Sequence, residues 1–353
     1  GDDATEVRQA AAAALGAVAT PAAAAALTPF LTDANDRVRR EAVLGLGRLP
    51  DGAIAERVRA FLVDPARRVR VAAAVVLGRQ RDRASVPLLL DRLAAPGTWE
   101  KPAILVALGR IGAADAVPAL RAASEHPAHW VRVCALHALG EIGGPEARDA
   151  ALGHARDPAW AVRGAAAIAL GEAGAADDLP VLLELLRDDH PWPRRGATYA
   201  IGRLGLAEAA PRLREGLTDP APEVRLAAVW ALGRLADDGA RDELVRLLYG
   251  VRPGDPDPLE LGAVTERDDP LRSDAESRLF DAAVQALGRL SRGVADPLVY
   301  RALTEVRGRL TDEELDRLAR LPLPELGSDR TPPTLRALFD SAIPTSGDDE
   351  DAG

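Results

Sequence analysis

Short blocks of apolar residues recur along the chain at a fixed spacing. An apolar residue followed by Gly closes each block, and the first eight of these pairs lie 31 residues apart. A ninth pair, Leu287-Gly288, follows after 55 residues, which is one period plus an insertion of 24. Strict periods of this kind are the signature of a solenoid built from stacked repeats. The first eight pairs are Leu15-Gly16, Leu46-Gly47, Leu77-Gly78, Leu108-Gly109, Leu139-Gly140, Leu170-Gly171, Ile201-Gly202 and Leu232-Gly233.

Each period predicts two helices. In the segment 157–171, Asp157 suits a helix N-cap, Pro158 suits the first turn, and Gly171 suits the left-handed position after the last turn. We name this second helix of the repeat the B helix. An A helix precedes each B helix, because segments such as 179–186 are apolar at helical spacing. We therefore predict an all-α, right-handed α-solenoid of about nine 31-residue helical hairpin repeats, closed by C-terminal capping helices.

The repeat unit carries a recognisable pattern of Val-Arg, a block of Ala and a closing Ala-Leu-Gly. This pattern resembles the short HEAT repeats of the phycobilin-lyase (PBS lyase) type over residues 1–248 and again over about 275–295. The resemblance implies a HEAT-like solenoid. It implies little about activity, because such repeats occur in scaffolds, lyases and adaptors alike.

The pattern divides the chain into four regions. Residues 1–248 hold repeats one to eight, of which the first begins at its B helix and lacks an A helix. Residues 249–274 are rich in Pro and Asp and predict a long insertion loop. Residues 275–325 predict the ninth repeat and capping helices, and residues 326–353 predict a short helix followed by an acidic, disordered tail.

The composition narrows the function. A net charge of -10 disfavours binding to nucleic acid or to an anionic membrane, unless positive charge is concentrated locally. Cys134 is the only cysteine, which excludes an intramolecular disulfide. No signal sequence and no apolar run of about 18 residues stand out, so we expect a cytoplasmic protein without a membrane segment. Lys101 is the only lysine, and this acidic, Lys-poor composition resembles that of proteins from salt-loving archaea.

Two faces of the B helix are distinguished by counting from the apolar residue of each Leu-Gly pair as position zero. Positions -8, -5, -4, -1 and 0 are mostly Val, Ala and Leu, and we expect them to face the core. Positions -9, -6, -2 and +2 lie on the opposite side, and position -10 joins them at the helix start. We expect these positions to be exposed and, by resemblance to HEAT folds, to line a concave groove.

Aromatic residues concentrate on the second set of positions. All five Trp fall there, and so do a His and a Tyr at position -2. Exposed Trp beside Arg is typical of binding hot spots, so we predict a strip that contacts a partner. The alternative is that the rings only pack on one another. The residues are Trp99, Trp130, Trp160, Trp192, Trp230, His137 and Tyr199.

Arginine recurs at position +2. Across positions -9, -6, -2 and +2, eleven Arg stand against five acidic residues, with Glu141 and Glu172 interrupting the series. Such a charge separation would attract an acidic partner to the groove. The alternative is a set of solvated helix ends. The candidate binding residues at position +2 are Arg48, Arg79, Arg110, Arg203 and Arg234.

A second Arg series, at position -7, has a structural interpretation. It recurs with Asp at position -13 in most repeats, which predicts an Asp-Arg ladder that ties neighbouring repeats together. The fourth repeat departs at both ends, with Ala95 and Lys101, and adds Pro102 in the first turn.

Catalytic patterns are not found in the sequence. The five His include no His-Glu dipeptide, so the paired motifs of HEAT-fold di-iron hydroxylases have no counterpart. His126 and His129 lie near Cys134, but Cys134 occupies a core position and suits packing better than metal binding. No Gly-rich phosphate loop or Ser nucleophile elbow is present, and we expect neither a cofactor nor a metal.

These observations favour a non-enzymatic scaffold or adaptor that binds an acidic protein segment in a Trp- and Arg-lined groove. Two alternatives remain open. Similarity to the bilin lyases would imply a tetrapyrrole in the groove, and HEAT-like DNA glycosylases resemble this design in placing Trp and Arg on a concave face. The Asp-rich loop 249–274 could itself fill the groove, and its Asp residues would then neutralise the Arg series without a partner protein.

Overall fold

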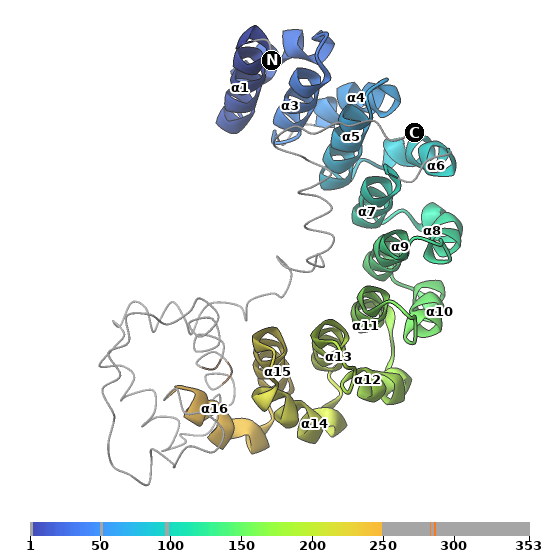
Figure 1. The fold of residues 1–353 in the computed structure, drawn as a ribbon, viewed down its shortest axis with the longest axis vertical. Helices are drawn as coiled ribbons and strands as arrows, with labels where there is room; N and C mark the ends of the chain where they lie inside the picture. The colour runs from blue at the N-terminus through green and yellow to red at the C-terminus, as the bar shows by residue number, and fades with distance from the viewer. Residues whose placement is uncertain (1–2, 50–51, 96–98, 249–282, 284–285, 287–353) are drawn as a thin grey trace. The chain divides into compact units, whose positions relative to one another are not determined.

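The computed structural model describes residues 3–49, 52–95 and 99–248, together with residues 283 and 286. Within these ranges every regular element is an α-helix or a short 3-10 helix (Figure 1). The prediction of an all-α fold is therefore confirmed. The predicted loop 249–274, the capping helices and the acidic tail lie outside the described residues.

B helices lie where the Leu-Gly pairs predict them. Their ends agree with the predicted ends to within a turn, because an apolar face of Val, Ala and Leu runs through each. The B helices of the described ranges are α1 (Asp3–Val18), α3 (Asp36–Leu46), α5 (Arg67–Arg79), α7 (Lys101–Ile111), α9 (His129–Ile142), α11 (Trp160–Ala173), α13 (Pro191–Leu204) and α15 (Pro222–Leu235).

A helices alternate with the B helices and are shorter. Most of them combine one or two turns of 3-10 helix with a short α-helix, and Pro stands in the first turn of several, where its missing N–H costs no hydrogen bond. They are α2 (Pro21–Leu27) with η1 (Thr28–Thr32), α4 (Gly52–Arg59) with η2 (Ala60–Val63), η3 (Arg83–Ser85) with α6 (Val86–Ala94), η4 (Ala114–Ala116) with α8 (Val117–Ser124), α10 (Pro145–His154), η5 (Ala176–Asp178) with α12 (Leu179–Leu185), η6 (Ala207–Ala209) with α14 (Ala210–Glu215) and η7 (Gly216–Thr218), and η8 (Asp238–Ala240) with α16 (Arg241–Leu248).

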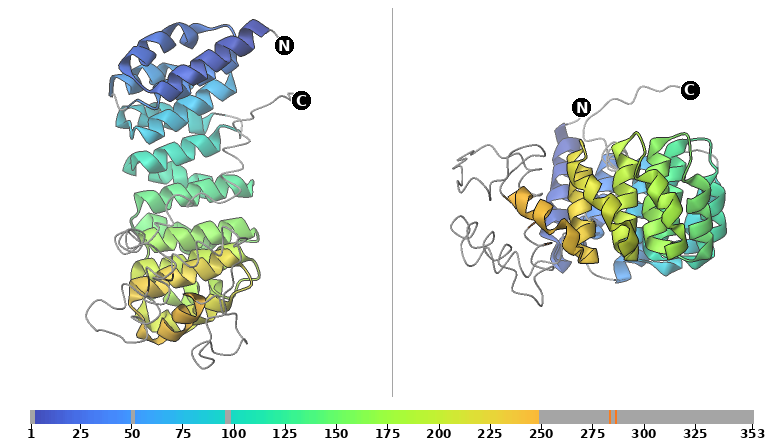
Figure 2. Two further views of the ribbon diagram at one scale, coloured as in Figure 1. Left: turned by 90° about the vertical axis from the view of Figure 1, so that its left-hand side faces the viewer. Right: turned by 90° about the horizontal axis from the view of Figure 1, so that it is seen from below.

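The described chain forms two compact units, which divide after Ala150. In each unit the B helices lie side by side as one layer, and the A helices cover one side of that layer (Figures 1 and 2). We name these the B layer and the A layer. Position-zero residues such as Leu77 and Leu170 are fully buried in the core. Ala283 and Ala286, core positions of the predicted ninth repeat, are buried in the hydrophobic cluster of the second unit.

The Gly of the Leu-Gly pair has a different role from the predicted one. We expected it in the left-handed position after the last turn, but Gly109, Gly171 and Gly202 lie inside α7, α11 and α13. The left-handed conformation is instead adopted by Gly112 and Gly205, which end α7 and α13. A Cβ on Gly109 would lie 2.7 Å from Cα of Ala138 in the next B helix. The repeating Gly is therefore a point of close contact between neighbouring helix backbones.

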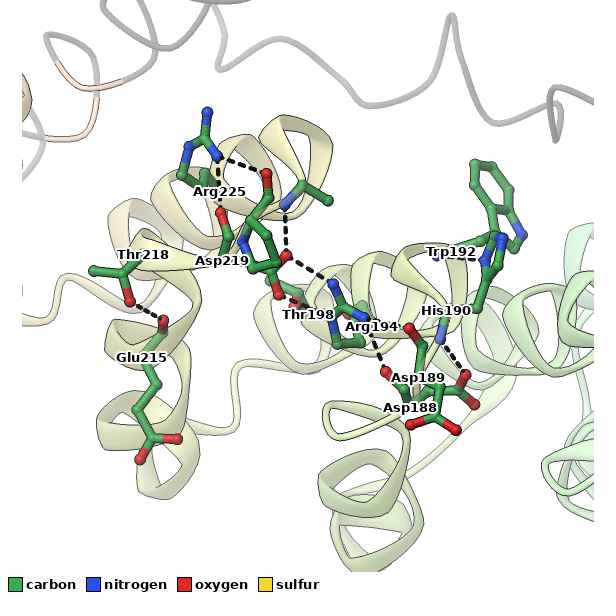
Figure 3. A network of polar contacts seen from close by, with 12 residues as sticks. Asp188, Asp189, His190, Trp192, Arg194, Thr198, Glu215, Thr218, Asp219 and Arg225 are labelled. Atoms are coloured by element: carbon green, nitrogen blue, oxygen red, sulfur yellow. Dashed lines mark hydrogen bonds and ion pairs between the residues drawn. The ribbon is translucent and has the colours of Figure 1, made fainter. Parts of the chain in front are cut away.

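The predicted Asp-Arg ladder is confirmed in both units. Arg194 Nε donates to Asp219 Oδ2 of the next repeat at 2.8 Å (Figure 3). Its Nη1 also donates to the carbonyl oxygen of Asp188, at 2.9 Å, in the loop that leads into its own helix. Each such Arg thus ties its own loop to the next repeat through charge-assisted hydrogen bonds. The corresponding pairs are Arg8–Asp33, Arg39–Asp64 and Arg163–Asp188.

The ladder Asp is not the helix N-cap that we predicted. Asp188 Oδ1 accepts from the backbone N–H of His190 at 2.9 Å, and His190, two residues later, is the N-cap of α13. The fourth repeat, which lacks the ladder Asp, uses a substitute. Arg70 Nε donates to Glu100 Oε2 at 2.9 Å, so that the ladder continues through a residue five positions further along.

The contribution of Asp188 in this ladder to the stability of the fold depends on pH. Burial acts to raise the pKa of Asp188, but hydrogen bonds from Arg163 and from the His190 N–H outweigh it, and the pKa lies below its ordinary value. A carboxyl whose pKa is lower in the folded state stabilises the fold above its unfolded pKa. That stabilisation is lost as the pH falls through the folded pKa.

We expect Asp188→Asn to lower the free energy of unfolding at neutral pH by about 2 kcal/mol, because the amide still accepts from His190 but loses the charged contact with Arg163. The difference from the unmodified protein should narrow as the pH falls from about 5 through the lowered pKa of the native carboxyl. Urea unfolding followed by far-UV circular dichroism measures both. Asp149→Asn, on the exposed side of α10, is the control. A gap of the same size at every pH would contradict this account.

Candidate partner-binding surface

The predicted aromatic strip is not uniformly exposed. Trp99 is 66% exposed, whereas Trp192, Tyr199 and Trp230 are only 5%, 6% and 6% exposed. Trp130, Trp160 and His137 lie between these extremes. The expectation that all of these side chains stand in solvent is therefore wrong for three of them, all in the second unit.

Close packing between B helices buries Trp192. Its indole ring lies against Gly164 of α11 so tightly that a Cβ on this Gly would overlap ring atoms Cδ1 and Nε1. Arg195 covers the ring, with its guanidinium carbon 4.9 Å from the ring centroid. A residue at position -9 is thus enclosed by the neighbouring repeat, because position -6 of that repeat has no side chain.

Tyr199 and Trp230 form a second enclosed pair between α13 and α15. Their ring centroids lie 5.1 Å apart with an angle of 20° between the planes. The Tyr199 hydroxyl donates to Glu172 Oε1 at 2.8 Å. Rings that stack across repeats, with the Tyr hydroxyl bonded internally, serve as packing.

Arg203 and Arg234, the described Arg residues at position +2 of the second unit, have partners within the protein. Arg203 Nη2 lies 2.8 Å from Glu172 Oε2, so one carboxylate receives both Tyr199 and Arg203. Arg234 lies over Trp230, 5.2 Å from the ring centroid, and its Nε donates to the Gly202 carbonyl oxygen at 3.1 Å. Among the described residues of this unit, Arg203 and Arg234 at position +2 therefore each contact the neighbouring B helix.

The first unit presents a different arrangement, which we name the Arg row: Arg48, Arg79 and Arg110. Arg48 and Arg79 are exposed and Arg110 is partly exposed, at the C-terminal ends of three successive B helices. Within the described ranges none of the three forms an ion pair. The pKa of Arg79 lies below its ordinary value, because of desolvation and then because of repulsion from Arg110 and Arg48. Three cations are therefore held near one another in this part of the chain. The Glu141 carboxylate lies beside Gly109, the residue before Arg110, because a Cβ on this Gly would be 2.9 Å from Glu141 Oε2.

An aromatic pair, of which Trp99 is exposed and Trp130 partly exposed, lies at the N-terminal ends of α7 and α9. Trp99 stacks on Trp130 with ring centroids 6.1 Å apart, and the Arg67 guanidinium carbon is 5.7 Å from the Trp99 ring. Because Trp99 is largely exposed, this group offers apolar area and positive charge to a partner. The first unit thus combines an exposed Trp and a row of Arg, the two features that the sequence predicted together on the B helices.

His190 was missed by the sequence interpretation. Its imidazole stacks on Trp160 with centroids 3.8 Å apart, and its Nδ1 accepts from the backbone N–H of Trp192 at 3.2 Å. Burial lowers the pKa of His190, which keeps Nδ1 free to accept. The sequence carries no specific signal for this N-cap, because the donor is the backbone N–H of residue 192, which almost any residue would supply. Glu141, which interrupts the Arg series, lies 4.0 Å from Nδ1 of His137.

A family model describing HEAT repeats matches the sequence over most of its length. The matched residues are 1–44, 24–104, 99–171, 145–201 and 179–252. The chain belongs to the HEAT-repeat family. The resemblance inferred from the repeat pattern is confirmed at this level, and the architecture is that of a protein-interaction scaffold. The inferred high-salt origin stays a prediction.

Solved structures similar to this HEAT-repeat protein include the following three. The complex of CpcE and CpcF of phycocyanin lyase from Nostoc is 20% identical, with 72% of this chain and 94% of that chain covered and a TM-score of 0.48. An engineered protein is 18% identical over 89% and 94% of the two chains, with a TM-score of 0.44. YibA of Escherichia coli is 19% identical over 84% and 92%, with a TM-score of 0.41. At these scores we draw no functional conclusion from them.

No curated protein matches the sequence. Among the described residues of this HEAT-repeat protein, no group of three or more His, Cys, Asp or Glu side chains is arranged to hold a metal ion. Cys134 is buried, and burial strongly raises the pKa of its thiol, which disfavours the thiolate form. No helix in the described ranges has the length and apolar character needed to cross a membrane.

Proposed function

We propose that this HEAT-repeat protein is a non-enzymatic scaffold or adaptor, and that the B layer of its first unit binds an acidic segment of a partner protein. The observation that carries the proposal is the Arg row, three cations that repel one another and form no ion pair in the described part of the chain. An acidic partner would relieve this repulsion and gain charge-assisted contacts.

Trp99 and Trp130 complete the proposed surface. Exposed Trp that becomes covered on binding contributes strongly to affinity, and Arg67 beside Trp99 adds positive charge. Trp160 and Arg234 remain candidates for an additional contact area in the second unit. In this proposal Trp192, Tyr199, Trp230 and Arg203 serve packing rather than contact.

The overall charge does not oppose this proposal. The net charge of -10 is an average over the molecule, whereas the Arg row concentrates cations on one face of the first unit. Separated charge of this kind steers an acidic partner to one surface. No observation in the described residues favours the tetrapyrrole or the nucleic-acid alternative over this one.

We expect the triple variant Arg48→Gln, Arg79→Gln, Arg110→Gln to lose a partner protein that the unmodified chain captures from a lysate of its source organism. The matched control is Arg57→Gln, Arg83→Gln, Arg121→Gln, which removes the same charge from exposed positions on the A layer of the same unit. Quantitative mass spectrometry of the captured proteins compares the two.

A protein absent only from the Arg row variant, with equal helicity in all three chains, supports the proposal. If both triple variants capture the same proteins as the unmodified chain, the Arg row is a set of solvated helix ends and the proposal fails.

A further inference from the structure

The ladder of ion pairs has one step without a carboxylate in the described part of the first unit. Arg8, Arg39 and Arg70, at position -7, each pair with a carboxylate of the following repeat. In the fourth repeat this position holds Lys101, and the next repeat has His126 where the ladder Asp would stand. Within the described residues Lys101 forms no ion pair. The ladder step from α7 to α9 therefore lacks its anion.

His126 performs only one of the two roles of a ladder Asp. Its Nδ1 accepts from the backbone N–H of Ala128 at 3.1 Å, just as the ladder Asp of other repeats accepts from the residue two positions later. Its imidazole does not neutralise Lys101. Burial lowers the pKa of His126, and the charges of Lys101 and Arg132 lower it further, so the ring is neutral at neutral pH. The loop is preserved, but the described residues supply no anion to Lys101.

The aromatic pair lies beside this incomplete step. Trp99 precedes Lys101 by two residues, so the Cα atoms of the two lie within about 7 Å of each other. Trp130, on which Trp99 stacks, lies in the first turn of α9, four residues after His126. The guanidinium of Arg67 lies over the Trp99 ring. An exposed ring, two cations and an unfilled ion-pair position are therefore within reach of a few residues of a partner.

We propose that a carboxylate of the bound acidic segment completes the ladder at Lys101, and that an aromatic residue next to it in the segment packs on Trp99. This inference rests on the proposed function and adds two residues of the partner that the surface recognises. A carboxylate is the group that neutralises the cation at the three preceding steps of the unit. Adjacent residues of a segment can reach both Lys101 and Trp99, because consecutive Cα atoms also lie only about 3.8 Å apart.

The charges of the cluster suit one carboxylate better than a nucleic acid. Single-stranded nucleic acid gains its affinity from a groove with many cations along the phosphates. Here Lys101 and Arg67 are the cations beside Trp99, in a chain with a net charge of -10. Glu100, between Trp99 and Lys101, is already paired with Arg70 and Arg92. A protein segment with an acidic residue beside an aromatic one is therefore the favoured occupant.

Lys101 can report on its own contacts. Because it is the only lysine, reductive methylation with a carbon-13 label gives one lysine signal in NMR spectra beside that of the N-terminal amine, and the positive charge is kept. The full chain is titrated at low salt with the peptide Ser-Gly-Asp-Tyr-Gly-Ser and with the same peptide carrying Asn instead of Asp, both with blocked ends. We expect the Asp peptide to shift the Lys101 signal and to bind about fivefold more tightly.

His126→Asp completes the ladder from within the chain and separates binding from folding. The new carboxylate keeps an acceptor for the Ala128 N–H and neutralises Lys101, so the midpoint of urea unfolding should not fall. We expect the affinity for the Asp peptide to drop about fivefold, to that of the Asn peptide. Arg121→Gln, on the exposed side of α8, lowers the net charge by the same amount and should leave both affinities unchanged. Trp99→Ala should weaken both peptides.

Several outcomes would overturn the inference. These are equal binding of the two peptides, failure of both to bind, a Lys101 signal that stays in place while the Asp peptide binds, and unchanged affinity in His126→Asp. If the lysate partner still depends on the Arg row in any of these cases, the proposed acidic partner stands and only its contact at Lys101 is rejected. Tighter binding of a single-stranded oligonucleotide than of the Asp peptide would assign the cluster to nucleic acid instead.

Discussion

Replacing Trp192 with Ala is expected to lower the free energy of unfolding by about 3–5 kcal/mol. The ring is 5% exposed and fills the space above Gly164, so its loss leaves a cavity between α11 and α13 as well as removing buried apolar area. Urea unfolding followed by far-UV circular dichroism measures the change without relying on the fluorescence of the residue that is removed.

Trp99→Ala is the matched comparison. This side chain is 66% exposed, and its removal is expected to change the free energy of unfolding by no more than about 0.5 kcal/mol. The two variants therefore separate packing from partner contact on the same kind of residue at the same repeat position. If Trp192→Ala were as stable as the unmodified chain but lost the partner, Trp192 would belong to the binding surface and its assignment to packing would be wrong.

The repeat architecture could be predicted because it is a local, periodic property. Residues such as Leu108 and Leu139 occupy equivalent core positions in successive periods, and both are fully buried. The same periodicity predicted the ladder. Arg194 and Asp219 lie 25 residues apart, and the same separation recurs in the pairs Arg8–Asp33, Arg39–Asp64 and Arg163–Asp188. The HEAT-repeat assignment follows from these regularities.

Exposure on the B layer could not be predicted in the same way. Counting along one helix places positions -6 and -2 on its outer side, but it does not say how closely the next helix approaches. Val71 at position -6 and Val106 at position -2 are buried, because contact residues such as Gly78 let the helices close over them. Whether a ring is covered depends on residues in another repeat, as Gly164 shows for Trp192.

Whether an Arg at position +2 forms an ion pair likewise depends on the residue at the same position of the neighbouring repeat. Arg79 and Arg203 occupy the same position in their B helices, and the sequence treats them alike. Glu172, 31 residues before Arg203, neutralises it, whereas the equivalent residue before Arg79 is Arg48. The candidate site thus narrowed from a strip along the repeats to the first unit once the neighbours across the layer were known.

The close contact at the repeating Gly predicts that Gly171→Ala is destabilising by about 1–3 kcal/mol. In an isolated helix this change would be favourable, because Ala has the higher helix propensity by about 1 kcal/mol. The new Cβ, however, would lie 2.8 Å from Cα and 3.1 Å from Cβ of Ala200, and a neighbouring backbone can yield only if α11 and α13 move apart. Such a movement would loosen the stacking of the two repeats along their whole contact.

Gly153→Ala provides the opposite expectation. Gly153 also lies within a helix, α10, but no atom is found within 4 Å of the position that its Cβ would take. The substitution should raise the free energy of unfolding by about 0.5–1 kcal/mol, through helix propensity alone. Chemical denaturation of both variants therefore gives changes of opposite sign if the Gly of the Leu-Gly pair is a contact residue. A stabilising effect at Gly171 equal to that at Gly153 would show that this Gly is an ordinary helix position rather than a contact between α11 and α13.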